Sequence, residues 1–172
     1  RINRSTLDHF ERHVWCLSTG RVGTNTIAAL GGLASEVLSL HEPKPLLYGL
    51  GRCAYEARSH DAGDGAANKN PAADSVDSIL IESVETCRRE LPFDGQRTYF
   101  ETSPQVTFVA RQLKNIYPDS RFVHVVRHPA EVVRSGMRRN WYAGNATDKW
   151  RIVPQGGMSR TEWDAMSPFE KN

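Results

Sequence analysis

The sequence predicts an α/β domain of three layers, in which helices cover both faces of a central parallel sheet. Short apolar runs alternate along the chain with longer segments whose apolar residues recur every three or four positions, a pattern typical of buried strands alternating with amphipathic helices. The length of 172 residues favours one domain over residues 1–172. The contents of 39% hydrophobic and 24% charged residues are those of a globular chain rather than a membrane or disordered one.

The first strand is predicted at residues 14–17, with a start as early as Arg12, because an apolar run precedes Ser-Thr-Gly there. A helix is expected over residues 24–38, where apolar positions follow a helical period that two successive glycines interrupt. A short extended piece at residues 38–42 follows. It is ended by Pro43, which disfavours a helical conformation in the residue before it.

The middle of the chain predicts an insertion between two regular elements. Residues 56–75 contain no Val, Ile, Leu, Met, Phe, Tyr, Trp or Cys, so this stretch cannot anchor itself in a core and is expected to be a mobile surface insertion, either a lid or a plain loop. A helix over residues 76–91 follows, capped by Asp74 or Ser75. Residues 97–101 are the next strand candidate.

The last predicted elements continue the alternation. A helix is expected over residues 105–117, and residues 121–126 indicate a second clearly buried strand in which His124 is a core residue. Pro129 suits the first position of a helix, which we expect to run to about Trp141. These strands and helices complete the predicted three-layer arrangement.

A glycine-rich loop links the first predicted strand to the helix after it. Glycines let the backbone approach an anion closely, and the helix N-terminus offers free N–H groups and the positive end of its dipole. Arg21 adds a planar cation, while Thr24 and Thr26 add hydroxyl donors. The loop therefore predicts a cradle for phosphate or sulfate. The kinase-type pattern G-x-x-x-x-G-K-[ST] fails here, because Thr24 rather than a lysine follows Gly23.

A second anion site is predicted after the strand at residues 121–126. Arg127 lies at the carboxyl end of that strand, where ligands gather in open α/β sheets, and Ser135 lies about two helical turns into the next helix. Residues 127–151 hold six basic and two acidic side chains, although the whole chain carries a net charge of only +2. A local basic patch on a nearly neutral chain favours a small anionic ligand over a nucleic acid.

These two motifs, in this order, resemble those of sulfotransferases that use 3′-phosphoadenosine 5′-phosphosulfate (PAPS). The glycine-rich loop is similar to the 5′-phosphosulfate loop P-[KR]-S-G-T-T, and Arg127-His128-Pro129 followed by Ser135 is similar to the 3′-phosphate motif V-R-[DN]-P-x-x-x-x-x-S. Residues 101–104 and 117–122 also look familial. The resemblance covers about residues 12–142 and implies a P-loop-containing nucleotide-binding type of fold.

The resemblance implies a role for each residue that matches its motifs. The 5′ end of the donor would be bound by Gly20, Arg21, Val22, Gly23, Thr24, Asn25 and Thr26, and the 3′-phosphate by Arg127 and Ser135. Three departures occur in the loop, where Gly20, Val22 and Asn25 replace a proline, a serine and a threonine. Val22 lacks the hydroxyl that the serine of the family motif carries. PAPS would be the donor, 3′,5′-adenosine bisphosphate (PAP) the product, and no metal is expected.

Catalysis would need a group that stabilises charge and a group that takes a proton. Arg21 is the candidate for charge that builds on the leaving phosphate. Glu42 and His41 lie at the end of the second strand candidate. Similarity to sulfotransferases with a glutamate at this distance favours Glu42 as the base, with His41 as the alternative. His13, like His9 and His60, is expected at the surface.

Other functions remain open on the sequence alone. The acceptor would be a small molecule, a carbohydrate or a peptide with a hydroxyl or amine group, and the alternatives are a small-molecule or nucleoside kinase on a related fold or a non-catalytic PAP-binding module. Nucleic acid is not an expected partner, and no stretch reaches the roughly 20 apolar residues that span a bilayer. The expected compartment is the cytoplasm, because three cysteines without a C-x-x-C pair favour a reducing environment; a signal or anchor upstream of Arg1 would change this expectation. Family members commonly continue further, so the C-terminal part of the family domain is expected beyond Asn172.

Overall fold

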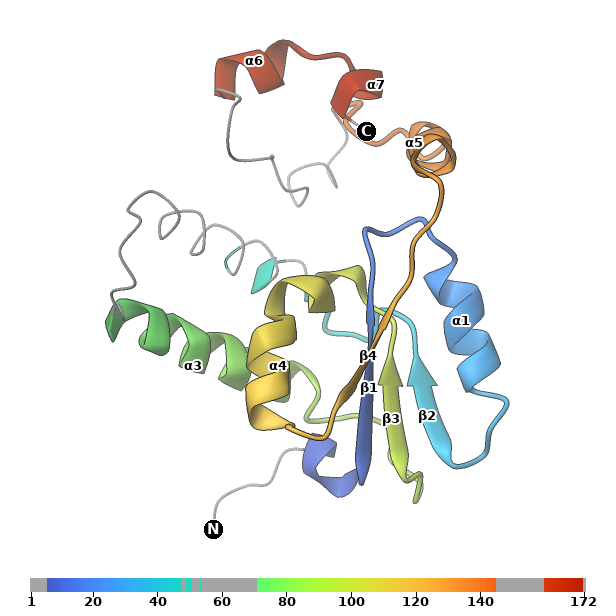
Figure 1. The fold of residues 1–172 in the computed structure, drawn as a ribbon, viewed down its shortest axis with the longest axis vertical. Coiled ribbons are helices and arrows are strands. Elements are labelled where there is room, and N and C mark those ends of the chain that lie inside the picture. Colours follow the sequence, from blue (N-terminus) through green and yellow to red (C-terminus); the bar gives the residue numbers. More distant parts are fainter. Residues whose placement is uncertain (1–5, 48, 51–52, 54–70, 145–159, 172) are drawn as a thin grey trace. The chain divides into compact units, whose positions relative to one another are not determined.

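The computed structural model describes residues 6–47, 49–50, 53, 71–144 and 160–171 (Figure 1). Contacts divide the chain into two compact units, Arg1–Val125 and Val126–Asn172. The first unit contains the sheet, and the second contains the helices α5, α6 and α7. None of the helices in the described residues is both long and apolar enough to cross a membrane.

The centre of the first unit is a parallel sheet of four strands in the order β2-β3-β1-β4. The strands are β1 (Arg12–Leu17), β2 (Val37–Leu40), β3 (Thr98–Glu101) and β4 (Arg121–His124). Glu101 lies opposite Trp15 of β1 and Leu40 of β2, which fixes the register at the carboxyl ends of the strands. The predicted α/β class with a central parallel sheet is confirmed.

Helices cover the two faces of this sheet, as Figure 1 shows. On one face, α1 (Thr24–Gly31) packs so closely that a Cβ atom on Gly31 would lie 2.7 Å from the Phe100 ring, and the Ser39 hydroxyl donates to the Ala28 carbonyl at 2.6 Å. The opposite face is covered by η1 (Thr6–His9), α3 (Pro71–Cys87), the 3-10 helix η2 (Pro104–Val109) and α4 (Ala110–Ile116). Because β1 and β3 are neighbours whose next helices lie on opposite faces, their carboxyl ends form the kind of switch point at which open α/β sheets bind ligands.

The core lies between the sheet and this second helical face. Its buried side chains are Leu7, Phe10, Trp15, Leu47, Leu80, Val84, Tyr99, Val106, Val109, Leu113 and Tyr117. His13 belongs here too, so the prediction that it lies at the surface is wrong. Its ring stacks on Tyr117 with centroids 4.2 Å apart, and its Nε2 donates to the Leu7 carbonyl at 2.8 Å. Burial lowers the pKa of His13, because a charged ring is poorly solvated there.

The bounds of the first two predicted helices are wrong. The helix expected over residues 24–38 ends at Gly31, where Gly32 donates back to the Ala28 carbonyl, and residues 37–40 form β2 instead. The helix α3 begins at Pro71, ahead of the predicted caps, because proline suits the first turn of a helix. The end of the predicted insertion is therefore helical, while residues 56–70 lie outside the described residues.

The strand β4 differs most from its prediction. It ends at His124 rather than at residue 126, and it lies at the edge of the described sheet with only β1 beside it. Arg121, Val123 and His124 are exposed, so the assignment of His124 to the core is wrong. An apolar run of this length does not reveal from sequence alone whether a strand is central or at an edge.

The second unit begins with α5 (Pro129–Met137), followed by α6 (Arg160–Ala165) and α7 (Pro168–Lys171). Pro129 starts α5 as predicted, but the helix stops four residues before Trp141. Asn140 and Tyr142 adopt left-handed backbone conformations with φ of 53° and 59°, which a helix cannot continue through.

Candidate functional site

Three loops leave the carboxyl edge of the sheet in the first unit, and they carry most of the residues predicted to bind or react. The loop after β1 holds residues 18–23, the loop after β2 holds residues 41–45, and Thr102 and Ser103 follow β3. Hydrogen bonds join the loop after β2 to Thr102, and the loop after β1 to Thr107 in η2. The structure therefore brings the predicted glycine loop and the predicted base candidates to the same edge of one sheet.

Three of the four residues from Gly20 to Gly23 have a left-handed backbone conformation. The φ angles are 82° at Gly20, 58° at Arg21 and 94° at Gly23. A Cβ atom at Gly23 would meet nothing within 4 Å, so glycine is favoured there by conformation rather than by space. Gly23 is also the N-cap of α1 and makes no side-chain cap bond, which leaves the first N–H groups of the helix facing the end of the loop.

The start of this loop is anchored to η2. The Thr107 hydroxyl accepts from the Ser18 amide at 2.9 Å and donates to the Ser18 carbonyl at 3.1 Å. The Gly20 amide donates to the Ser18 hydroxyl at 3.4 Å. These bonds hold the backbone where it leaves β1, so the loop begins from a fixed position.

The side chains of the loop differ in exposure. Gly20 and Thr24 are buried, and Arg21 and Val22 are half-buried. The exposed members are Gly23, Asn25 and Thr26. The arrangement offers an anion backbone N–H groups from the start of α1 together with the Arg21 guanidinium from the preceding turn.

The two base candidates follow β2 directly and are held differently. Nδ1 of His41 lies 3.0 Å from Oγ1 of Thr102 and 3.2 Å from the Thr102 carbonyl oxygen. Because a carbonyl only accepts, Nδ1 must carry the proton, and in the neutral ring Nε2 then carries the lone pair. Glu42 has a φ of 47°, a left-handed conformation that is uncommon for a residue with a side chain.

The second predicted anion site lies on α5 in the second unit. Oε2 of Glu131 accepts from Nη2 of Arg127 at 3.0 Å and from Nη2 of Arg134 at 2.9 Å. Ser135 lies four residues beyond Glu131, on the same face of the helix. Arg127 thus reaches Glu131, on the face of α5 that also carries Ser135.

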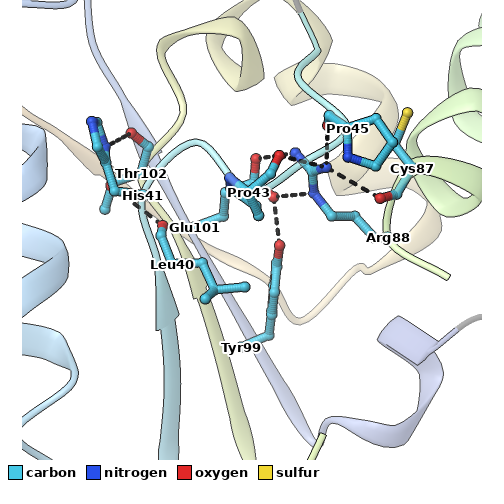
Figure 2. A network of polar contacts seen from close by, with 9 residues as sticks. All are labelled: Leu40, His41, Pro43, Pro45, Cys87, Arg88, Tyr99, Glu101 and Thr102. Carbon is cyan, nitrogen blue, oxygen red and sulfur yellow. Dashed lines mark hydrogen bonds and ion pairs between the residues drawn. The ribbon is translucent and has the colours of Figure 1, made fainter. Parts of the chain in front are cut away.

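Sequence reasoning missed a buried polar network beneath the loop after β2 (Figure 2). It joins Arg88 at the end of α3 to Tyr99 and Glu101 of β3. A usable signal was present, because Leu80, Val84 and Arg88 are spaced by four residues and so share one helix face. An arginine on the core-facing stripe of a helix predicts a buried acidic partner.

Ser103 and Phe108, which follow β3, lie in or near the core. Ser103 is 2% exposed and occupies the N-cap position of η2 without a side-chain cap bond, and Phe108 packs against the core cluster. Within the described ranges, no group of three or more His, Cys, Asp or Glu side chains is arranged to hold a metal ion.

Comparison with known proteins assigns this chain to a family. The sequence model of the sulfotransferase family matches residues 41–170, which is more than half of the chain. The match includes His41, Glu42, Arg127 and Ser135 and begins after the glycine loop. No curated protein and no solved structure matches the chain significantly.

Proposed function

The chain belongs to the sulfotransferase family, and from this membership we propose that it moves a sulfuryl group from PAPS to a hydroxyl or amine acceptor and releases PAP. The observation that carries the proposal is the glycine loop. Its left-handed turn opens at the uncapped N-terminus of α1, at the carboxyl edge of a parallel sheet. This donor set of backbone N–H groups beside an arginine suits the oxyanions of a phosphosulfate.

Residues 20–26 would bind the 5′ end of the donor. The N–H groups at the start of α1 would meet the phosphate oxygens, and Arg21 would stabilise the charge that develops on the leaving phosphate as the bond to sulfur breaks. That charge grows in the transition state, so Arg21 would contribute more to turnover than to PAP binding.

Arg127 and Ser135 would hold the 3′-phosphate, the group that distinguishes this donor from ordinary nucleotides. Support comes from the reach of Arg127 onto the face of α5 that bears Ser135. Glu131 now accepts from both Arg127 and Arg134. A phosphate would take over these charge-assisted bonds, with Arg127 offering a planar fork of donors.

Proton removal would fall to Glu42 or His41. Family resemblance favours Glu42, whereas the contact with Thr102 favours His41, because a base works best when a third group fixes its orientation. In the reaction, the acceptor oxygen or nitrogen bonds to sulfur as the bond from sulfur to the bridging phosphate oxygen breaks. The acceptor's proton goes to the base, and the electron pair of the broken bond leaves on PAP.

Calorimetry with PAP, PAPS and Mg·ATP tests the donor. We expect PAP to bind and Mg·ATP to bind far more weakly. The Arg127→Ala variant should bind PAP about 10–100-fold more weakly, since a hydrogen bond to a charged group contributes about 1.5–3 kcal/mol. Preference for Mg·ATP would indicate a kinase instead. PAP binding without transfer of radiolabelled sulfate to any acceptor pool would indicate a non-catalytic PAP-binding module.

The His41→Gln and Glu42→Gln variants separate the two base candidates, because each substitution removes one group that could take the acceptor's proton and leaves a polar side chain in its place. The true base is the residue whose loss lowers turnover while the Kd for PAP stays nearly unchanged.

A further inference from the structure

The polar network beneath the loop after β2 is built around a fully buried ion pair. Nε and Nη2 of Arg88 donate to Oε2 and Oε1 of Glu101 at 2.8 and 2.7 Å, and the exposed fraction of both side chains is 0%. The Tyr99 hydroxyl also donates to Oε2 of Glu101 at 2.5 Å. Burial works to lower the pKa of Arg88, but the hydrogen bonds and charge of Glu101 raise it above its ordinary value. Arg88 therefore stays charged.

The remaining nitrogen of Arg88 is used on the backbone of the loop. Nη1 donates to the carbonyls of Pro45 at 2.8 Å and Pro43 at 3.3 Å, and to the carbonyl of its neighbour Cys87 at 3.3 Å (Figure 2). Proline has no N–H group, so at these two positions the loop presents only acceptors. Arg88 provides a donor for both carbonyls.

The carboxyl end of β3 also holds His41, the first residue of the loop. Thr102 follows Glu101 directly and contacts Nδ1 of His41, while its hydroxyl is 3.4 Å from the Leu40 carbonyl. The loop of residues 41–45 is thus fixed at His41 by Thr102 and at both prolines by Arg88. Glu42 lies between these two attachments.

We propose that Arg88, held by Glu101, is a positioning residue that fixes the loop of residues 41–45 and so places His41 and Glu42 for proton removal from the acceptor. The proposal rests on the proposed function in its assignment of the base to this loop. Arg88 itself does not contact the acceptor. Its effect is geometric, and a displacement of about 1 Å in a reacting group can cost about 100-fold in rate.

The Arg88→Lys variant tests the positioning role. Lysine keeps a positive charge beside Glu101, but its compact ammonium lacks the planar fork that reaches the carboxylate and both carbonyls together. The Glu101→Gln variant is the second test, since it keeps an acceptor for Tyr99 and weakens the hold on Arg88. The matched control is Arg97→Lys, because Arg97 makes the same two-bond contact with Glu11, at 2.9 and 2.6 Å, on the exposed surface.

Turnover, PAP affinity and amide hydrogen exchange are then measured on each folded variant. We expect Arg88→Lys to lower kcat about tenfold or more while the Kd for PAP stays within about twofold. Exchange should rise at the amides of His41, Glu42 and Lys44 and remain low in β1 and β3. Arg97→Lys should change none of these quantities. If kcat and loop exchange match the wild type in both Arg88→Lys and Glu101→Gln, the positioning role is overturned.

The exchange measurement also separates failure of this proposal from failure of the proposed function. A wild-type chain that binds no PAP and transfers no sulfate overturns the proposed function, and loop exchange then still decides whether Arg88 holds residues 41–45. A rise in exchange throughout β1 and β3, together with loss of PAP binding, shows that Arg88 supports the whole fold and overturns a specific positioning role.

Discussion

Glu101 and Glu131 each bind arginine, yet their surroundings give them different capacities. Glu101 pairs with Arg88 in the core, where both side chains have an exposed fraction of 0%. Glu131 pairs with Arg127 and Arg134 at the surface, where the exposed fractions are 37% for Glu131, 42% for Arg127 and 61% for Arg134. Both glutamates form the same kind of carboxylate–guanidinium pair, so they differ chiefly in their access to water.

Access to water decides what each carboxylate can give up. If Glu101 loses Arg88, its charge is left buried without a partner or water, so the pair is costly to break and is suited to holding the backbone in one place. Around Glu131 water and other anions can replace the carboxylate at modest cost. An exchangeable pair of this kind suits the proposed 3′-phosphate site, where an incoming phosphate would displace Glu131 from Arg127.

The largest expected effect comes from breaking the buried pair on one side. Arg88→Ala should lower the free energy of unfolding by about 3–5 kcal/mol, because Glu101 is left as an uncompensated buried charge. Urea denaturation measures the change. A loss below about 1 kcal/mol, the range of surface pairs, would remove the distinction between the two glutamates.

The double variant Arg88→Met with Glu101→Gln is the control for that loss. It removes both charges, and the glutamine carbonyl still accepts from Tyr99, so much of the stability should return. Turnover should not return, because the carbonyls of Pro43 and Pro45 still lack the donor that holds the loop.

The next effect is a gain in affinity at the surface pair. Glu131→Gln should tighten PAP binding by about 2–10-fold, since the phosphate no longer competes with a carboxylate worth about 0.2–1 kcal/mol per exposed pair. Calorimetry in low salt measures it, and Glu131→Asp is the control that keeps the charge. Weaker binding by Glu131→Gln would show instead that Glu131 orients Arg127 for the phosphate.

Sequence patterns predicted the strands of the sheet well, because apolar runs indicate buried segments and Gly, Ser, Thr and Pro mark where elements begin and end. The run before Ser-Thr-Gly gave β1 its bounds from Arg12, and Pro129 marked the start of α5. Burial was predicted wrongly for two histidines, because contacts between distant segments decide whether each of them is buried. His13 is buried by stacking on Tyr117, and β4 lies at an edge, which leaves His124 exposed. Neither fact is contained in the local pattern.

The sequence singled out candidate residues of the site, but it did not predict the contacts that hold them in place. Motif spacing pointed to Arg21, Arg127 and Ser135, since anion binding needs particular residue types close together along the chain. The contact of Thr102 with His41 joins residues 61 positions apart. That contact exists only because β2 and β3 are neighbours in the sheet, which no single segment of the sequence specifies.

The buried ring of His13 contrasts with Arg88, because burial outweighs the opposing effects of the Leu7 carbonyl and the Asp8 carboxylate on its pKa. Burial lowers the pKa of His13 in the folded chain below its ordinary 6.5, so below about pH 6.5 the unfolded chain takes up a proton that the folded chain resists. Stability should therefore be complete above pH 6.5 and fall with pH down to the folded pKa, by at most about 1.4 kcal/mol per pH unit. Urea midpoints at pH 7.5 and 5.5 measure this loss, and His13→Gln, which keeps a donor for Leu7, should reduce it. An unchanged pH dependence in that variant would assign the effect to other groups.

The smallest effect concerns a buried polar atom at the opposite extreme from Glu101. Among the described residues, the Ser103 hydroxyl is buried and has no hydrogen-bond partner, whereas the Ser120 hydroxyl, also buried, donates to the Tyr117 carbonyl at 2.7 Å. Ser103→Ala should raise the free energy of unfolding by up to about 1 kcal/mol, because it removes an unpaired polar group, and Ser120→Ala should lower it by about 1 kcal/mol. Urea denaturation of the two variants compares them directly. The Glu101 carboxylate has hydrogen-bond partners, and the Ser103 hydroxyl has none among the described residues. If Ser103→Ala loses as much stability as Ser120→Ala, the presence of a hydrogen-bond partner does not govern the energy of buried polar groups at this end of β3.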